Sequence, residues 1–247
     1  MRLISNPRTT QGFTLVELAI VLVIVAFLTG GLLMGITAQR SSAENTDAQR
    51  QLENIREALI GFAMANGRLP CPADPALTSA DATVGLEDRA NTNLPCNREY
   101  GVIPWVTLSL PETDPWGRRF TYFSSAKFTA PRATGSLSSF TLYTGSIHPM
   151  TGVDDSAGLA NIKDDLGATS KIASDLPAVI VSHGANGFGG WQPNGTRFGA
   201  ANGNELENAN LTQTFVARTP GSNFDDLMVW IAPSVLKSRM VAAGNLP

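Results

Sequence analysis

Cysteine and histidine are scarce in this chain, and basic residues are not in excess. Among 247 residues there are two cysteines and two histidines, which argues against a four-ligand Cys/His zinc site. Lysine and arginine number 18 against 21 aspartates and glutamates, so the basic face of a nucleic-acid-binding protein is not expected. Hydrophobic residues make up 43% of the chain, which excludes a disordered polypeptide.

The apolar residues are concentrated near the N-terminus. Residues 13–38, FTLVELAIVLVIVAFLTGGLLMGITA, carry a single charge, that of Glu17. As a helix this segment would be about 39 Å long, and the hydrocarbon core of a bilayer is roughly 30 Å thick. Arg2 and Arg8 precede the segment, and basic flanks stay on the cytoplasmic side. The sequence therefore predicts one membrane-spanning helix over residues 13–38, with the rest of the chain outside the inner membrane.

Two other interpretations of this segment remain open. It could be a secretory signal peptide cleaved after Ala38, although its apolar run is longer than that of a usual signal peptide. It could also be an ordinary signal anchor in which Glu17 is incidental. A carboxylate within a membrane segment costs on the order of 2.5–3.5 kcal/mol at the centre, so an acid there indicates a function and needs a cationic partner.

The residues around Glu17 form a recognisable motif. Gly12 is followed by an aromatic residue, by Glu17 and by the apolar run, in the sequence GFTLVEL over residues 12–18. This arrangement resembles the N-terminal signal of type IV pilins and type II secretion pseudopilins. The resemblance implies that prepilin peptidase cleaves between Gly12 and Phe13 and then N-methylates Phe13. Residues 1–12 would then be a leader that is absent from the mature protein.

Cleavage gives Glu17 a potential cationic partner. It would create an α-ammonium group on Phe13, four residues before Glu17 and therefore on the same helix face. The resemblance implies that in a filament this carboxylate meets the Phe13 ammonium of a neighbouring subunit. Two desolvated charges stabilise each other only when both are present, so the pair would select the correct stagger during assembly.

The helix is expected to continue beyond the membrane segment. Apolar residues recur at three- and four-residue steps between residues 39 and 67, at Leu52, Ile55, Leu59 and Phe62, as in an amphipathic helix. A stop signal, Asn66-Gly67, follows. We therefore expect one helix from Phe13 to about Asn66, of which residues 39–67 are the extracytoplasmic half.

Residues 68–247 are predicted to form a globular head with an α+β fold. Strands are expected at residues 118–123, 139–144, 178–182 and 227–231, and a helix at 233–243. Because the strands follow the long helix and do not alternate with helices, the sheet should be antiparallel, as in pilins. Residues 145–175 and 183–223 are expected to be long irregular loops, which are uncommon unless they have a function or are mobile.

Cys71 and Cys96 are expected to pair within this head. The predicted topology places them in an oxidising compartment, where a disulfide is the usual state of two cysteines. Two reduced, buried thiols are the alternative. Closing the loop would stabilise the fold by roughly 3–4 kcal/mol in the chain-entropy model.

Acidic residues offer a possible metal site. Aspartates occur as doublets at residues 154–155, 164–165 and 225–226, and hard oxygen ligands suit calcium. The resemblance implies a calcium site near the end of the chain, as in major pseudopilins, with Asp225 and Asp226 as candidate ligands. Doublets in loops that are merely solvated are the alternative. No nucleotide-binding or hydrolase motif accompanies the glycine-rich residues 183–190.

The sequence predicts a structural filament subunit and not an enzyme. The resemblance implies a subunit of a type IV pilus or a type II secretion pseudopilus, with prepilin peptidase, an inner-membrane assembly platform and other subunits as partners. A minor pilin that contacts a surface, DNA or another pilin through residues 145–175 and 183–223 is the alternative. An enzyme tethered by a signal anchor has no supporting group of residues.

Overall fold

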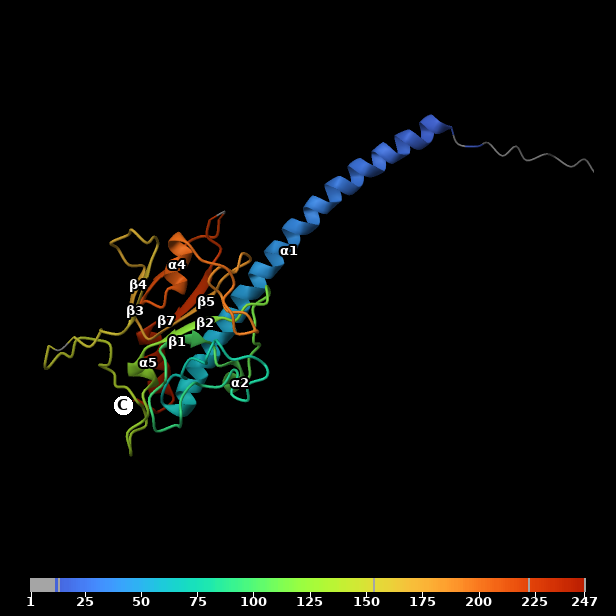
Figure 1. The fold of residues 1–247 in the computed structure, drawn as a ribbon. Coiled ribbons are helices and arrows are strands. Elements are labelled where there is room, and N and C mark those ends of the chain that lie inside the picture. Colours follow the sequence, from blue (N-terminus) through green and yellow to red (C-terminus); the bar gives the residue numbers. More distant parts are fainter. Residues whose placement is uncertain (1–11, 13, 153, 222, 247) are drawn as a thin grey trace, which may run out of the picture. The chain divides into compact units, whose positions relative to one another are not determined.

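The computed structural model describes Gly12 and residues 14–152, 154–221 and 223–246; residues 29–38 are described by their backbone alone. The chain divides into two compact units, Met1–Ala43 and Glu44–Pro247. Helix α1 (Leu15–Asn66) runs through the boundary between them (Figure 1). The expected long helix is thus confirmed from Leu15 to Asn66, whereas Phe13 lies outside the described residues.

In the first unit, the side chains of α1 from residue 15 to residue 28 are exposed, and all of them except Glu17 are apolar. Leu15 is 88% exposed and Phe27 is 79% exposed. Within the described residues, we find no helix with both the length and the apolar character required to span a membrane.

In the second unit, the C-terminal part of α1 has the predicted apolar stripe. Leu52, Ile55 and Leu59 are buried, whereas Phe62 is half-buried. The helix ends where the sequence predicts. The backbone amide of Gly67 donates to the carbonyl of Ala63 over 2.7 Å, with Gly67 in the left-handed conformation (φ 69°) that glycine adopts easily at a helix C-terminus.

The second unit contains a four-stranded antiparallel sheet against which α1 packs. Its strands are β1 (Tyr100–Val102), β2 (Thr121–Ser124), β5 (Ala178–Ser182) and β7 (Leu227–Ile231), in the order β1-β2-β5-β7. Every pair is antiparallel. The predicted α+β class is therefore confirmed, and the predicted strands 178–182 and 227–231 are correct. The strand predicted at 118–123 is β2, which begins three residues later.

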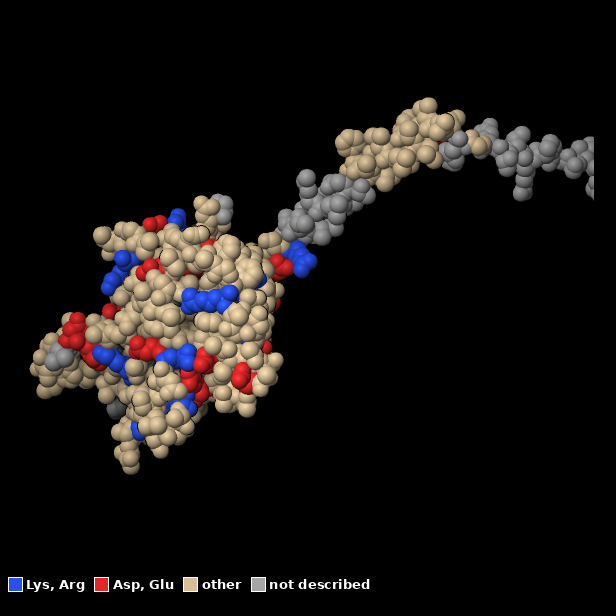
Figure 2. All heavy atoms as spheres, viewed as in Figure 1, with Lys and Arg blue, Asp and Glu red and all other residues tan. Residues whose placement is uncertain are grey.

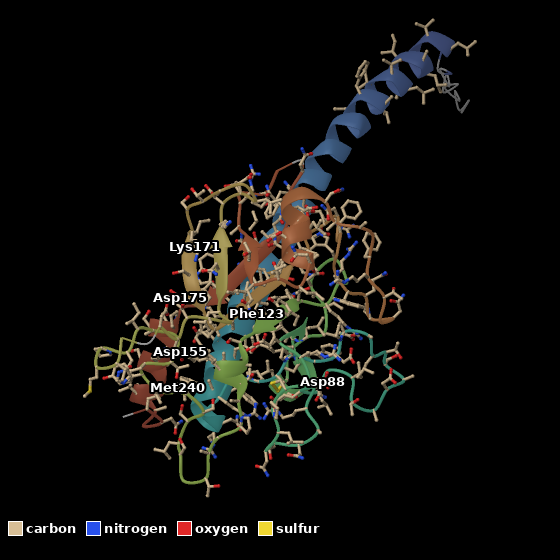
Figure 3. All side chains as sticks on the ribbon, turned by 60° about the vertical axis from the view of Figure 1, so that its left-hand side comes forward. Asp88, Phe123, Asp155, Lys171, Asp175 and Met240 are labelled. Carbon is tan, nitrogen blue, oxygen red and sulfur yellow. A yellow bond between two sulfur atoms is a disulfide. The ribbon has the colours of Figure 1, made fainter. Side chains whose placement is uncertain are left out.

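The sheet is covered on both faces, and β5 is buried along its whole length. Ile180 belongs to the apolar core shared with α1, whereas Val179 and Val181 pack on the other side of the sheet. There they meet a second sheet that the sequence did not predict. It consists of β4 (Ala173–Leu176), β3 (Ala160–Lys163) and β6 (Thr214–Val216), with β3 antiparallel to β4 and parallel to β6. Phe123, labelled in Figure 3, lies in this interior and contacts Phe215 at a ring distance of 6.1 Å.

Short helices complete the unit. They are α2 (Trp105–Leu108), α3 (Ala126–Thr129), α4 (Gly203–Ala209) and α5 (Pro233–Ala242). Helix α5 confirms the helix predicted at 233–243. Leu236 and Met240 are fully buried on its inner side, as expected, but Val235 is 47% exposed.

The strand predicted at residues 139–144 is wrong, because this segment folds into turns. Ser138 Oγ accepts a hydrogen bond from the backbone amide of Phe140, and Thr144 Oγ1 accepts one from that of Thr141. Hydroxyl groups here take the amide hydrogens that a strand would offer to its neighbour.

The prediction that residues 145–175 and 183–223 are irregular is also wrong in part. The first segment contains β3 and the beginning of β4, and the second contains α4 and β6. These strands have three or four residues, too few for an alternating pattern to stand out in the sequence.

Candidate functional site

The motif at the N-terminus begins outside the helix. Gly12 is exposed and not helical, and α1 starts at Leu15. The backbone amide of Glu17 donates to Thr14 Oγ1 over 3.3 Å, and Glu17 Oε2 accepts from the backbone amide of Thr14 over 3.5 Å. This reciprocal pair is a capping box. The proposed cleavage bond therefore lies just before the first helical turn, although Phe13 itself is outside the described residues.

An apolar surface follows the capping box along α1. A shallow groove of about 410 Å³ is lined by Leu15, Val16, Ala19, Ile20, Val23 and Ile24. Large exposed apolar surfaces on a protein indicate contact with a membrane or with other proteins. This part of α1 is therefore suited to bundling with other apolar helices or with lipid.

The head contains the predicted disulfide between Cys71 and Cys96, with an S–S distance of 2.01 Å. An ion-pair network lies beside it. Arg68 forms a two-point contact with the carboxylate of Glu87, over 2.6 and 3.0 Å, and the Cys71 backbone amide also donates to Glu87. Arg89 contacts both sulfur atoms.

Asp225 and Asp226, the predicted calcium ligands, are brought together with a third carboxylate, Glu205. One oxygen atom from each of the three lies within 4.8 Å of the other two. Glu205 comes from α4, and the two aspartates immediately precede β7. Only 5% of Glu205 and 3% of Asp226 are exposed. Sequence reasoning missed Glu205, because nothing in the spacing of residues 205 and 225 indicates that they meet.

The surrounding polypeptide holds these carboxylates in place. Asn186 donates its side-chain amide to Glu205 over 2.8 Å and its backbone amide to Asp225 over 2.7 Å. Gly184 leaves room for Asp225, since a Cβ atom at this position would lie 2.5 Å from Asp225 Cγ. The Asn208 side chain donates to Asp226 over 2.8 Å.

Two oxygen atoms of the cluster, Asp225 Oδ1 and Asp226 Oδ1, are buried and have no hydrogen-bond donor within the described part of the chain. His183 Nδ1, which is also unsatisfied, lies 3.4 Å from Asp226 Oδ1. Burial raises the pKa of the Glu205 carboxyl, and the charges of Asp226 and Asp225 contribute to the increase. Oxygen atoms that are buried, unpaired and close together fit a hard cation such as calcium.

A polar cavity of about 670 Å³ adjoins this carboxylate cluster, because Glu205 lines both. Its other lining residues come from the 183–223 segment and from the turn before β7, and include Asn186, Phe188, Asn202, Asn204, Arg218 and Phe224. Figure 2 shows acidic and basic side chains intermixed on the visible face of this unit.

Comparison with known proteins gives one match. The family model for the prokaryotic N-terminal methylation motif matches residues 7–33, which include the GFTLVEL sequence. No curated protein and no solved structure matches the chain. This motif is the signature of proteins that enter the membrane as precursors and assemble into filaments. The chain carries the N-terminal signature of type IV pilins and pseudopilins, which indicates a structural subunit.

Proposed function

We propose that the chain is a structural subunit of a type IV pilus or a type II secretion pseudopilus. The observation that carries the proposal is the methylation motif at residues 7–33, which extends into the apolar first part of α1. Prepilin peptidase cleaves between Gly12 and Phe13 and methylates Phe13. The precursor crosses the inner membrane once through residues 13–38, with the head in the periplasm, until the assembly platform moves it into the filament.

In this proposal the chain acts by packing its α1 helix against those of other subunits. The exposed side chains of α1 exchange lipid for the same face of neighbouring subunits, and Glu17 pairs with the Phe13 ammonium of one neighbour. The exchange is favourable only at the stagger that pairs both charges, since an unpaired buried charge costs free energy. The head, residues 68–247, decorates the outside of the helix bundle.

The mature N-terminus tests this proposal directly. We expect mass spectrometry of the full-length product to find a chain that begins with N-methylated Phe13. The same chain made in a peptidase-deficient strain should begin at Met1 and stay in the membrane fraction. A start near Gln39, or an intact Met1 in the normal strain, would contradict the proposal.

A minor pilin with a binding role is the second candidate, and the cavity beside Glu205 favours it. The cavity is formed largely by the 183–223 segment, and bundling of the α1 helices in a filament core does not require so long a segment in the head. Abundance separates the two candidates. Quantitative mass spectrometry of sheared filaments should find this chain as the main component if it is a major subunit, and at a small fraction if it is a minor one.

We also propose that Glu205, Asp225 and Asp226 bind calcium, which would neutralise charge in the head. The two unsatisfied aspartate oxygens support this assignment. Titration of the full-length chain in detergent micelles should give a saturable heat and a higher unfolding temperature with calcium, and a smaller response with magnesium. No heat and no thermal shift with calcium would remove the assignment and leave the filament proposal intact.

A further inference from the structure

The guanidinium group of Arg89 lies against the disulfide. Arg89 Nε donates to Cys71 Sγ over 2.9 Å, and Nη2 donates to Cys96 Sγ over 3.4 Å. Nη2 also donates to the carbonyl of Thr129 over 2.7 Å. The Arg89 side chain is only 4% exposed, so its orientation toward the sulfur atoms is fixed by the surrounding fold.

This cation has little negative charge to balance it. The carboxylate in range is Glu87, 3.9 Å from Arg89 Nε, and among the described residues no other acid forms an ion pair with Arg89. Glu87 is already engaged by Arg68 at 2.6 Å. Burial lowers the pKa of Arg89, and the charge of Arg68 lowers it further. Two guanidinium groups therefore share one carboxylate beside the sulfur atoms, which leaves an excess of positive charge there.

The two cysteine residues differ in exposure. Cys71 is fully buried, whereas Cys96 is half-exposed and follows an exposed run of residues, 90–95. A thiolate from solution can approach Cys96, and the sulfur atom released by its attack is that of Cys71. Cys71 Sγ is also the sulfur atom nearer to Arg89, and a neighbouring cation stabilises a thiolate.

We propose that Cys96 is a site of thiol–disulfide exchange. The thiolate of an external reductant attacks Cys96 Sγ, the S–S bond breaks, and its electron pair remains on Cys71 as a thiolate held by Arg89. A second thiol of the reductant then releases Cys96, which takes a proton from water. The cysteines gain two electrons and the reductant becomes its own disulfide. A leaving group stabilised in this way speeds exchange and favours the reduced form.

The consequence is a head whose stability depends on the thiols around it. The disulfide joins residues separated by 25 positions, and the enclosed segment includes Glu87 and Asp88. Reduction removes the cross-link that closes this loop. The inference concerns the head alone, so it does not depend on whether the chain enters a pilus or a pseudopilus.

The first experiment maps the exchange in the unmodified full-length chain in detergent. The protein is treated briefly with glutathione, quenched with an alkylating reagent and analysed by peptide mass spectrometry. We expect glutathione on Cys96 and the alkyl group on Cys71. Glutathione mainly on Cys71, or equally on both, would overturn the proposal. In parallel, the protein is treated with reduced thioredoxin. Comparing the two reaction rates, each divided by the concentration of thiolate, shows whether a protein dithiol or a small thiol is the faster reductant.

The second experiment removes the cation. Equilibration with dithiothreitol should give an Arg89→Met variant an equilibrium constant for reduction at least about tenfold below that of the unmodified chain, equivalent to about 30 mV. Arg98→Met is the matched control, because Arg98 pairs with Asp74 and Asp88 and, within the described part of the chain, does not bond to either sulfur atom. Equal effects of the two substitutions would overturn the proposal.

A third measurement needs no variant, in case Arg89→Met fails to fold. In the reduced chain, the alkylation rate of each cysteine is followed against pH. Cys71 should reach half of its maximal rate clearly below the ordinary thiol pKa of about 8.5. A half-maximal pH for Cys71 at or above that value would overturn the proposal.

Discussion

Glu17 and Thr14 hold each other at the start of α1, each backbone amide donating to the side-chain oxygen of the other residue. Glu17 therefore has a local structural contact in addition to its charge. The two contributions can be separated, because a glutamine at position 17 keeps an oxygen that can accept the Thr14 amide but carries no charge. A valine at this position removes both.

We predict that Glu17→Gln leaves membrane insertion unchanged but lowers the amount of the chain in sheared filaments at least about tenfold. The physical reason is that the Phe13 ammonium of the neighbouring subunit loses its partner, and an unpaired buried charge costs several kcal/mol. Immunoblots of membrane and filament fractions measure the effect. Thr14→Val is the control, since it removes the cap and keeps the charge, and it should still assemble. Filaments containing Glu17→Gln at normal levels would refute the charge-pairing role.

The Glu205 carboxylate is the sharpest test of the calcium proposal. We predict that Glu205→Gln raises the unfolding temperature in EDTA, because it removes one of three neighbouring carboxylates, and that it abolishes the response to calcium. For the unmodified chain, calcium at one hundred times its dissociation constant should add about 2.7 kcal/mol to the free energy of unfolding. Differential scanning calorimetry measures both quantities.

Glu207→Gln is the matched control for Glu205. Glu207 lies on the same helix, is half-exposed and bonds to Asn210, so it is separate from the carboxylate cluster. Its substitution should leave the calcium response in place. An undiminished calcium response in Glu205→Gln would exclude Glu205 as a ligand.

The parts of the fold that the sequence predicts are those with a strong local pattern. The stripe of Leu52, Ile55 and Leu59 places the helix face that packs on the sheet. The strand Ala178–Ser182 is predicted correctly because its first four residues are apolar without interruption, and the structure buries both of its faces. The disulfide could be predicted because the chain has two cysteines and the predicted topology places both in an oxidising compartment.

The parts that the sequence does not predict depend on tertiary contacts. Strand β6 has three residues, and its Val216 bonds at both backbone groups to the Asn208 side chain of α4. That pairing between a helix side chain and a strand has no local signature. Glu205 lies beside Asp225 and Asp226 because α4 is held against β6 in this way, so the third carboxylate of the proposed calcium site could not be identified from sequence alone.

Arg119 is a buried cation that joins distant segments of the head. It is 0% exposed, and it binds the carboxylate of Glu112 over 2.8 Å. Its remaining hydrogens go to the carbonyl oxygens of Pro75, Leu77 and Pro193. Because these acceptors are far apart in the sequence, one side chain fixes three loops.

We predict that Arg119→Met lowers the free energy of unfolding by about 3–5 kcal/mol, since several acceptors lose their donor in the interior. Urea denaturation of the full-length chain measures the loss. The adjacent Arg118 is half-exposed and donates to the carbonyl of Trp116, so Arg118→Met should cost about 1.5 kcal/mol or less. Similar losses for the two variants would show that the buried network adds no more than an ordinary surface contact.

Asp114 and Asp155 should have opposite effects on the pH dependence of stability. Asp114 is buried, and it accepts hydrogen bonds from Ser182 and two backbone amides. Burial nevertheless raises the pKa of its carboxyl. Asp155, labelled in Figure 3, is bonded by Lys127, which lowers the pKa of its carboxyl.

The sign follows from which state binds the proton more readily. The native state binds a proton at Asp114 more readily than the unfolded state does. The contribution of Asp114 to stability is therefore present below the unfolded pKa and is lost as the pH rises through the native pKa. At Asp155 the unfolded state binds a proton more readily, so its contribution is present above the unfolded pKa and is lost as the pH falls through the native pKa. We predict that, as the pH falls from about 7 to about 4, the stability of the unmodified chain rises relative to Asp114→Asn and falls relative to Asp155→Asn. Urea denaturation in EDTA measures both differences, and parallel slopes for the two variants would contradict the assignment of burial as the dominant effect at Asp114.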